Sequence, residues 1–207
     1  MTTSSVPDSP SALHSPAAER NKQPILEALQ ALLPPRGRAL EIASGSGQHI
    51  AHFAAGLPGW HWLGSDPSPE ARASIAAWWP QGSAALALDV QNPDWGLPAE
   101  RLPLDLIHCA NMLHIAPWAS SAALFQGASR HLAATGLLTV YGPFVVPDEP
   151  TAPSNLAFDA DLRSRNPAWG LRSLDAVQAC AQEAGLRLRQ RLSLPANNLL
   201  LVWERQP

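Results

Sequence analysis

Apolar and polar positions follow one another in blocks that predict alternating helices and strands. A first helix begins after Ser15-Pro16, carries apolar residues at helical spacing, and ends at Pro34-Pro35. Beyond it we expect helices over 47–56, 68–79, 117–134 and 173–184. Short apolar runs predict strands over 38–44, 60–66, 85–90, 104–111, 136–144, 186–194 and 197–205.

This alternation predicts an α/β domain with a doubly wound, mostly parallel sheet of seven strands. The first five strands are expected in the order 3-2-1-4-5. No helix is predicted between the final two strands, so they should form an antiparallel hairpin. Residues 1–13 are predicted to be a disordered tail and residues 14–207 the domain. The proline-rich stretch 142–172 is the longest irregular region, and long loops in compact domains are often functional.

Composition narrows the possible functions. Hydrophobic residues make up 46% of the chain, which is typical of a globular domain. A net charge of −3 argues against general nucleic-acid binding, which needs a basic surface. Two cysteines cannot build a disulfide framework or a four-cysteine zinc site, and no metal site is expected. Without a signal peptide or a membrane-spanning run, the sequence predicts a soluble cytoplasmic protein.

A glycine turn follows the first predicted strand and is the main candidate for a ligand site. Ser44-Gly45-Ser46-Gly47 lies where doubly wound folds bind ligands, at the carboxyl end of a strand before a helix. Asp66 ends the second strand, 19 residues after Gly47, a spacing that suits hydrogen bonds to ribose hydroxyls. Asp89 and Val90 end the third strand and are candidates to face an adenine ring. Each aspartate alone has a simpler explanation as a turn or cap residue.

The pattern Glu41-x-Ala43-x-Gly45-x-Gly47 resembles the glycine-rich motif of class I S-adenosylmethionine-dependent methyltransferases. Ala43 departs from it, since many members have glycine there. The stretches SPAAERNKQPIL, LEIASGSGQHIAHFA, CANMLHIAPW, YGPF, SNLAFDADLRSRNPAWG and LPANNLLLVWER together resemble the uncharacterised family that includes methyltransferase-like protein 26. The resemblance implies the Rossmann-like class I methyltransferase fold and an S-adenosylmethionine site, and it names no substrate.

Further candidates lie near the expected ligand edge. Asn111 follows the fourth strand and is a candidate cofactor contact. His114 is a candidate general base, or else caps a helix or orients Trp118. Tyr141 ends the fifth strand on the same side and is a second catalytic candidate.

The polar start of the first helix could fold over this site. Arg20 and Asn21 are candidates to bind the cofactor carboxylate or an anionic substrate, against the alternative of a solvated helix face. Phe158 and Trp169 are candidates to wall an apolar pocket. Asp159 and Arg163 have the spacing of a helical ion pair, whereas Asn155 and Asn197 suit turns. His108 is expected to be a core histidine.

The leading prediction is methylation of a small molecule, with no nucleic-acid or membrane partner. A nicotinamide-dependent oxidoreductase is a weaker alternative, because Ile50 occupies the position of the third glycine in G-x-G-x-x-G. A cofactor-binding protein without catalysis and a protein or RNA methyltransferase also stay open. The sequence does not indicate the acceptor or the oligomeric state.

Overall fold

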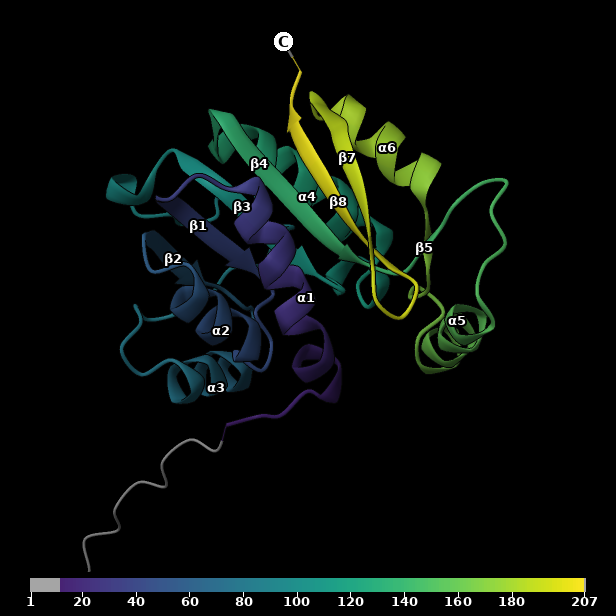
Figure 1. Cartoon of the computed structure of the whole chain (residues 1–207), viewed down its shortest axis with the longest axis horizontal. Helices are drawn as coiled ribbons and strands as arrows, with labels where there is room; N and C mark the ends of the chain where they lie inside the picture. The colour runs from purple at the N-terminus through teal and green to yellow at the C-terminus, as the bar shows by residue number, and fades with distance from the viewer. Residues whose placement is uncertain (1–11, 207) are drawn as a thin grey trace, which may run out of the picture.

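The main sheet is six-stranded, in the order β2-β1-β3-β4-β8-β7 (Figure 1). The computed structural model describes residues 12–206. The strands are β1 (Gly37–Ile42), β2 (Trp60–Gly64), β3 (Leu104–Ala110), β4 (Leu132–Gly142), β7 (Leu186–Leu194) and β8 (Asn198–Arg205). The pairs among β2, β1, β3 and β4 are parallel, whereas β8 pairs antiparallel with both β4 and β7. The predicted α/β class and the terminal antiparallel hairpin are confirmed.

Helices cover both faces of the sheet. The helices are α1 (Pro16–Leu32), α2 (Gln48–Gly56), α3 (Pro69–Trp78), α4 (Trp118–His131), α5 (Pro153–Arg165) and α6 (Leu174–Glu183), with short 3-10 turns η1 (Ala99–Arg101) and η2 (Met112–His114). Figure 1 shows α1 and α2 in front of the sheet and α4 behind it. Because both faces are covered, the central strands are almost continuously apolar.

Two apolar cores result, one on each face of the sheet. Alternate residues of β1 serve them, so that Ala39 packs with α1, α2 and α3 while Leu40 packs with α4 and α6. Leu29 of α1 and Phe53 of α2 are fully buried in the first core. The regularly spaced apolar residues that predicted the first helix are therefore the ones that α1 packs against the sheet.

The predicted third strand over 85–90 is wrong, and this is why the main sheet has six strands rather than seven. This segment meets β2 through one isolated parallel bridge between Ser65 and Leu86. Backbone hydrogen bonds join Leu86 N to Gly64 O at 2.9 Å and Asp66 N to Leu86 O at 3.0 Å. Beyond this bridge the segment forms no ladder, although Leu88 and Val90 are buried in the core as strand residues would be. It still lies beside β2, where a third strand was expected.

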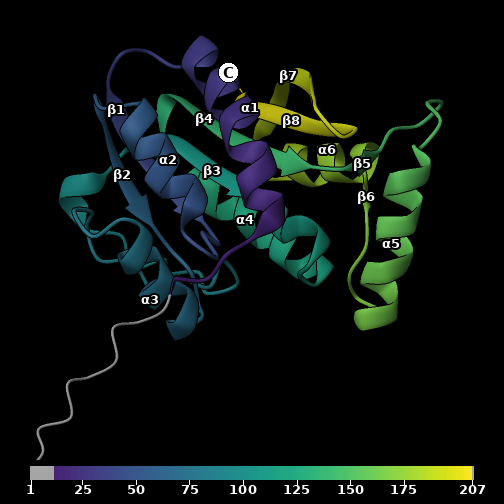
Figure 2. The ribbon, with the colours of Figure 1, turned by 60° about the horizontal axis from the view of Figure 1, so that its bottom comes forward.

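The region 142–172 is more regular than its prolines predicted. It contains the helix α5 and a small parallel pair of strands, β5 (Phe144–Val145) and β6 (Arg172–Ser173). Pro153 opens α5 at a position where proline favours a helix. Only Asn155 and Leu162 of this helix are buried, so it lacks the apolar stripe that identifies a helix in a sequence. In Figures 1 and 2, α5 lies away from β2, α2 and α3.

The predicted tail falls almost entirely outside the described residues. Leu13, which is described, is fixed to α3: its N–H donates to Ser74 Oγ at 2.7 Å, and its carbonyl accepts from Trp78 Nε1 at 2.8 Å. Among the described helices, none has the length and apolar character that crossing a bilayer requires.

A tight contact between α4 and a loop provides a test of the packing. Gly127 lies in α4 against the Trp95 indole, and a Cβ at position 127 would overlap that ring. We expect Gly127→Ala to lower the free energy of unfolding by roughly 1–3 kcal/mol, although alanine favours helices. Urea denaturation measures this. In a Trp95→Leu background the same substitution should lower the free energy of unfolding by much less. An equal loss in both backgrounds would show that the Trp95 ring is not the cause.

Candidate functional site

The glycine turn lies between β1 and α2 at the carboxyl edge of the sheet. Ala43, Gly45 and Gly47 have φ angles of 52°, 54° and 89°, all in the left-handed region. Gly47 has no room for a side chain, because a Cβ there would lie 2.7 Å from the Ile75 backbone of α3. At Gly45 the nearest atom to such a Cβ is the Ala43 carbonyl oxygen at 3.9 Å. The backbone at Gly45 is therefore open to a ligand, as a nucleotide-type cofactor site requires.

Asp66 holds this turn against the end of β2. Its Oδ2 accepts a hydrogen bond from Gly45 N at 3.0 Å, and its Oδ1 accepts one from Ser68 N at 2.9 Å. Ser44 N donates to Ser65 O at 2.8 Å and Ser65 Oγ donates to Glu41 O at 2.7 Å. The carboxylate lies beside the open backbone of Gly45, where the sequence placed it, and fixes the conformation of the turn.

Asp89 and Val90 lie in the loop that follows the Leu86 bridge, next to the end of β2. Asp89 is exposed, and its Oδ1 accepts a hydrogen bond from Gln91 N at 2.9 Å. Val90 is buried in the core on the α4 side. The Asp89 side chain thus caps a local turn and stays exposed to solvent.

Glu41 is buried below the turn rather than exposed on it. It is 1% exposed, and its Oε2 has no hydrogen-bond partner among the described residues. Burial, reinforced by the negative charge of Asp66, raises the pKa of Glu41 to about 8. The nearest basic group is His49 Nδ1, 3.9 Å from Glu41 Oε1.

A buried histidine links the Glu41 region to α1. Nε2 of His49 lies 2.6 Å from Asn21 Oδ1, and burial lowers the pKa of His49 to about 4. The ring is therefore neutral near pH 7, and its Nε2–H donates to the Asn21 oxygen. Asn21 and Tyr141 line the same cavity, and burial raises the pKa of the Tyr141 hydroxyl. The polar start of α1 is thus packed onto the site instead of facing solvent.

Further contacts fix α1 over the beginning of α2. Gln48 Nε2 donates to Glu19 Oε2 at 2.8 Å, and Gln48 Oε1 accepts from Ser15 N at 2.6 Å. Lys22 pairs with Glu19 on the exposed side of the same helix. These bonds close the turn region from the α1 side.

A cavity of about 800 Å³ lies beside this arrangement. Four predicted site residues, Arg20, Asn21, Asn111 and Tyr141, line it together, and so do the predicted wall residues Phe158 and Trp169. Its other lining residues are Ser15, Ala17, Pro24, Ile115, Pro143, Asn155, Leu162, Arg165, Pro195, Ala196 and Asn198. Such a volume suits a small molecule.

Asn111 and His114 follow β3 but differ in exposure. Asn111 has a left-handed φ of 61°, and its N–H donates to Tyr141 O at 2.8 Å. His114 is fully buried, packs edge-on against Phe144 at a ring distance of 5.0 Å, and does not line the cavity. Burial, with the nearby positive charge of Arg172, lowers the pKa of His114 to about 3. Neither ring nitrogen has a partner among the described residues.

Other candidates occupy structural positions. His108 Nδ1 lies 2.9 Å from Thr139 Oγ1 inside the sheet, so His108 is a core histidine as expected. Arg163 Nε lies 2.8 Å from Asp159 Oδ2, which confirms the helical ion pair.

Arg165 and the tip of the β7–β8 hairpin are cavity residues that the sequence reasoning missed. Arg165 lies in the last turn of a helix without an apolar stripe, so no pattern marked it. At the hairpin tip, Ala196 and Asn197 have φ angles of 60° and 57°. A left-handed alanine is strained, and such strain next to a cavity is the signal that sequence alone did not carry.

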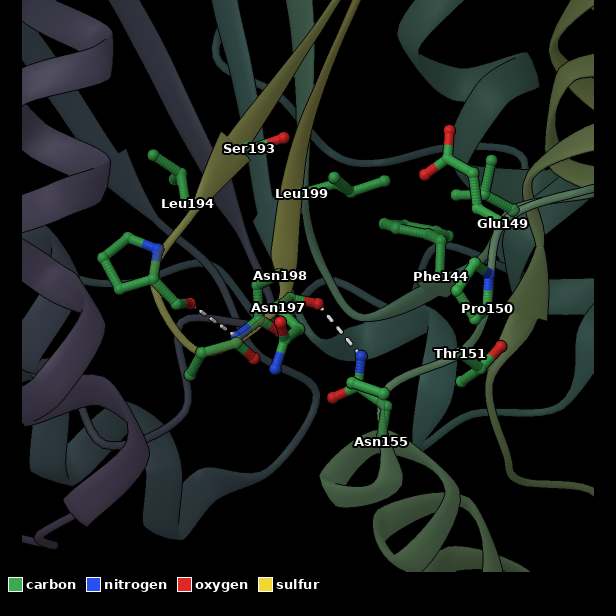
Figure 3. Close-up of a pocket in the computed structure, with 14 residues that line it drawn as sticks. Phe144, Glu149, Pro150, Thr151, Asn155, Ser193, Leu194, Asn197, Asn198 and Leu199 are labelled. Atoms are coloured by element: carbon green, nitrogen blue, oxygen red, sulfur yellow. Dashed lines mark hydrogen bonds between the residues drawn. The ribbon is translucent and has the colours of Figure 1, made fainter.

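A second cavity of about 430 Å³ adjoins the first on the other side of this hairpin tip. Figure 3 shows residues that line this second cavity, with the hydrogen bond that Asn155 Nδ2 donates to Asn197 O at 3.0 Å. Asn155, Pro195, Ala196 and Asn198 line both cavities. Asn155 was expected to serve in a turn. Instead, its side chain joins α5 to the hairpin.

Solved structures of similar fold are methyltransferases. CalO1, a methyltransferase in calicheamicin biosynthesis in its SAH-bound form, matches with a TM-score of 0.75 and 17% identity over 91% of this chain and 54% of that chain. Human N-acetylserotonin methyltransferase in complex with SAM matches with a TM-score of 0.76 and 15% identity over 92% of this chain and 53% of that chain. The mitomycin 7-O-methyltransferase MmcR matches with a TM-score of 0.76 and 16% identity over 91% of this chain and 54% of that chain.

The fold is therefore the Rossmann-like class I methyltransferase fold, and this chain spans about half the length of those proteins. Within this class, the chain belongs to the family described as protein of unknown function (DUF938), whose model matches residues 12–205.

The buried ionisable groups of the site predict a pH optimum for stability. His49, His108 and His114 have pKa values of about 4, 3 and 3 in the fold, against 6.5 ordinarily. Below pH 6.5 the unfolded chain binds more protons, so the free energy of unfolding falls as the pH drops, by about 1 kcal/mol per pH unit for each histidine. Glu41 acts oppositely: with its pKa raised from 4.5 to about 8, its contribution is lost as the pH rises toward 8.

We expect maximum stability near pH 6.5, where the histidine effect ends and the Glu41 effect continues alone. Chemical denaturation between pH 5 and 8.5 measures the curve. Glu41→Gln should remove the decline on the alkaline side and make the fall in stability below pH 6.5 steeper, because the opposing Glu41 effect is removed there too. A wild-type curve that is flat from pH 6.5 to 8 would show that Glu41 does not hold its proton in the fold.

Proposed function

We propose that this protein is an S-adenosylmethionine-dependent methyltransferase that acts on a small molecule. The observation that carries the proposal is the open left-handed turn at Gly45, held by Asp66, next to a cavity lined by Asn111 and Tyr141. The SAM- and SAH-bound neighbours support the choice of cofactor. So does the resemblance to the family that includes methyltransferase-like protein 26.

The described residues fit such a cofactor. Under the proposal, the backbone from Ala43 to Gly47, including Ser44 and Gly45, contacts it closely, and Asp66 accepts hydrogen bonds from the ribose hydroxyls. Asp89 and Val90 flank the adenine at the neighbouring loop. Arg20, Asn21 and Asn111 bind its amino-acid end from the cavity side. Glu41 supports the turn from below through its backbone, since its side chain is buried.

S-adenosylmethionine supplies a methyl group on a positively charged sulfur, and an acceptor lone pair takes the methyl as the carbon–sulfur bond breaks. The protein's task is to align the acceptor in the cavity and exclude water. A hydroxyl acceptor must also lose a proton. We assign the contact that orients this hydroxyl to Tyr141, which lines the cavity. His114 does not line the cavity, and its pKa of about 3 makes it a poor proton acceptor near neutral pH, so it has no assigned role in the transfer.

Cofactor binding is the direct test of the proposal. We expect S-adenosylmethionine and S-adenosylhomocysteine to bind with micromolar affinity in calorimetric titrations. Asp66→Asn should weaken binding by about tenfold or more, because it removes the charged acceptor of hydrogen bonds at the ribose.

Asp105→Asn is the matched control. Asp105 also accepts one backbone hydrogen bond, from Arg38 N at 2.9 Å, but it lies at the start of β3. Both variants are compared by thermal melting, so that loss of folding is separated from loss of binding. A folded wild-type protein that binds neither compound would refute the proposal and favour a role without this cofactor. Binding of NADH instead would favour the oxidoreductase alternative.

The catalytic assignments are tested by transfer of a labelled methyl group from S-adenosylmethionine into fractionated cell extract. Label in the small-molecule fraction is expected, and Tyr141→Phe should lower the rate by about tenfold or more while leaving cofactor affinity unchanged. His114→Gln should leave the rate within about twofold, because His114 does not line the cavity. A tenfold loss of rate in a folded His114→Gln variant would contradict this division of roles, and label found only in protein or RNA would contradict a small acceptor.

A further inference from the structure

The charged side chains that line the larger cavity, beside the glycine turn, are all positive. Within the part of the chain that the structure describes, Arg20 and Arg165 are its only charged lining residues, and no aspartate or glutamate lines it. Arg20, in α1, makes no side-chain hydrogen bond or ion pair with any residue in 12–206. Two cations without a lining anion make this cavity a site for a negatively charged ligand.

The two arginines come from different helices, and the proposed function uses only one of them. Arg20 adjoins Asn21 on α1, near the turn, where the carboxylate of the cofactor would lie. Arg165 belongs to α5, which lies beyond the sheet on the side away from α2 and α3 (Figure 2). One positive charge is therefore left for the second ligand of the cavity.

Arg165 has no strong partner within the protein. Its Nη1 is 3.7 Å from Asp161 Oδ2, and the two side chains are 59% and 60% exposed. An exposed pair at this distance contributes little, so the guanidinium can turn to another anion. Its carbon atom Cζ lies 5.3 Å from the centroid of the Trp169 ring, which orients it at the cavity wall.

Aromatic and apolar side chains form the wall around Arg165. Phe158 and Ile115 are 37% and 45% exposed although both are large apolar residues of the lining. Trp169 adds a second aromatic ring to the lining, and Tyr141 also lines the cavity although it is only 2% exposed. Exposed apolar groups gathered at a cavity are typical of a ligand surface, and flat rings favour a flat ligand.

We propose that the methyl acceptor is a planar, largely apolar molecule that carries a carboxylate, and that Arg165 binds this carboxylate. Its role as acceptor rests on the proposed function, but the ligand class rests on the cavity alone. Arg165 is then a specificity residue: it orients the acceptor between Phe158 and Trp169 and excludes neutral molecules of the same shape.

The test uses two pairs of probes that differ only in charge: naphthalene-2-carboxylate with naphthalene-2-carboxamide, and benzoate with benzamide. Each is titrated by calorimetry into the full chain, with and without saturating S-adenosylhomocysteine. We expect at least one carboxylate to bind about tenfold more tightly than its amide, as a charged hydrogen bond to arginine implies.

Arg165→Gln should abolish this preference and leave the affinity for the amide within about twofold. Arg189→Gln is the matched control, because it removes the same charge from an exposed residue of β7 that does not line the cavity, and it should keep the preference. Thermal melting checks the folding of both variants.

Three results would overturn the inference: equal binding of carboxylate and amide, a preference that survives in Arg165→Gln, or no binding of any probe. The titrations without S-adenosylhomocysteine keep this test separate from that of the proposed function. A carboxylate preference lost in Arg165→Gln supports the ligand class even if S-adenosylhomocysteine does not bind, and binding of S-adenosylhomocysteine alone supports only the proposed function.

Discussion

The parallel pairing of β1 with both β2 and β3 is the constraint on which the site depends. Each pair is in register over four or five residues, so the three strands end at one edge of the sheet. Parallel strands need crossover helices, and the chain must therefore leave β1 sharply to begin α2. Two left-handed glycines and a left-handed alanine make that exit. The Asp66 carboxylate then fixes the turn by accepting the N–H of Gly45.

This arrangement explains why the positions of the glycine turn and of Asp66 could be predicted from the sequence. The turn residues and Asp66 lie at strand ends, and strand ends can be located from short apolar runs. The segment over 85–90 looked like a strand because its burial resembles that of one, with Leu88 and Val90 in the core. Whether such a segment forms a ladder depends on a neighbour at the sheet edge, which no local pattern encodes.

The larger cavity was harder to predict, because it is assembled from distant parts of the chain. Arg20, Arg165 and Asn198 line one cavity although they lie in α1, in α5 and at the β7–β8 hairpin. The polar residues at the start of α1 were candidates to fold over the site, with a solvated helix face as the alternative. Helix α5 gave no apolar stripe, since its exposed residues face a cavity and solvent instead of a core. The hydrogen bond from Asn155 to Asn197 spans 42 residues, and it sets the boundary between the two cavities.

The position of β8 has a consequence for how the protein forms during synthesis. β8 follows β7 in the chain, yet it lies between β4 and β7. While the ribosome has produced the chain only as far as β7, β4 still has a bare edge, with apolar residues such as Leu138 and Val140 without their partners Trp203 and Leu201. Such an edge can pair with other nascent chains. Residues 198–205 must leave the exit tunnel before the sheet closes, so chaperone protection matters most in the interval before β8 pairs with β4.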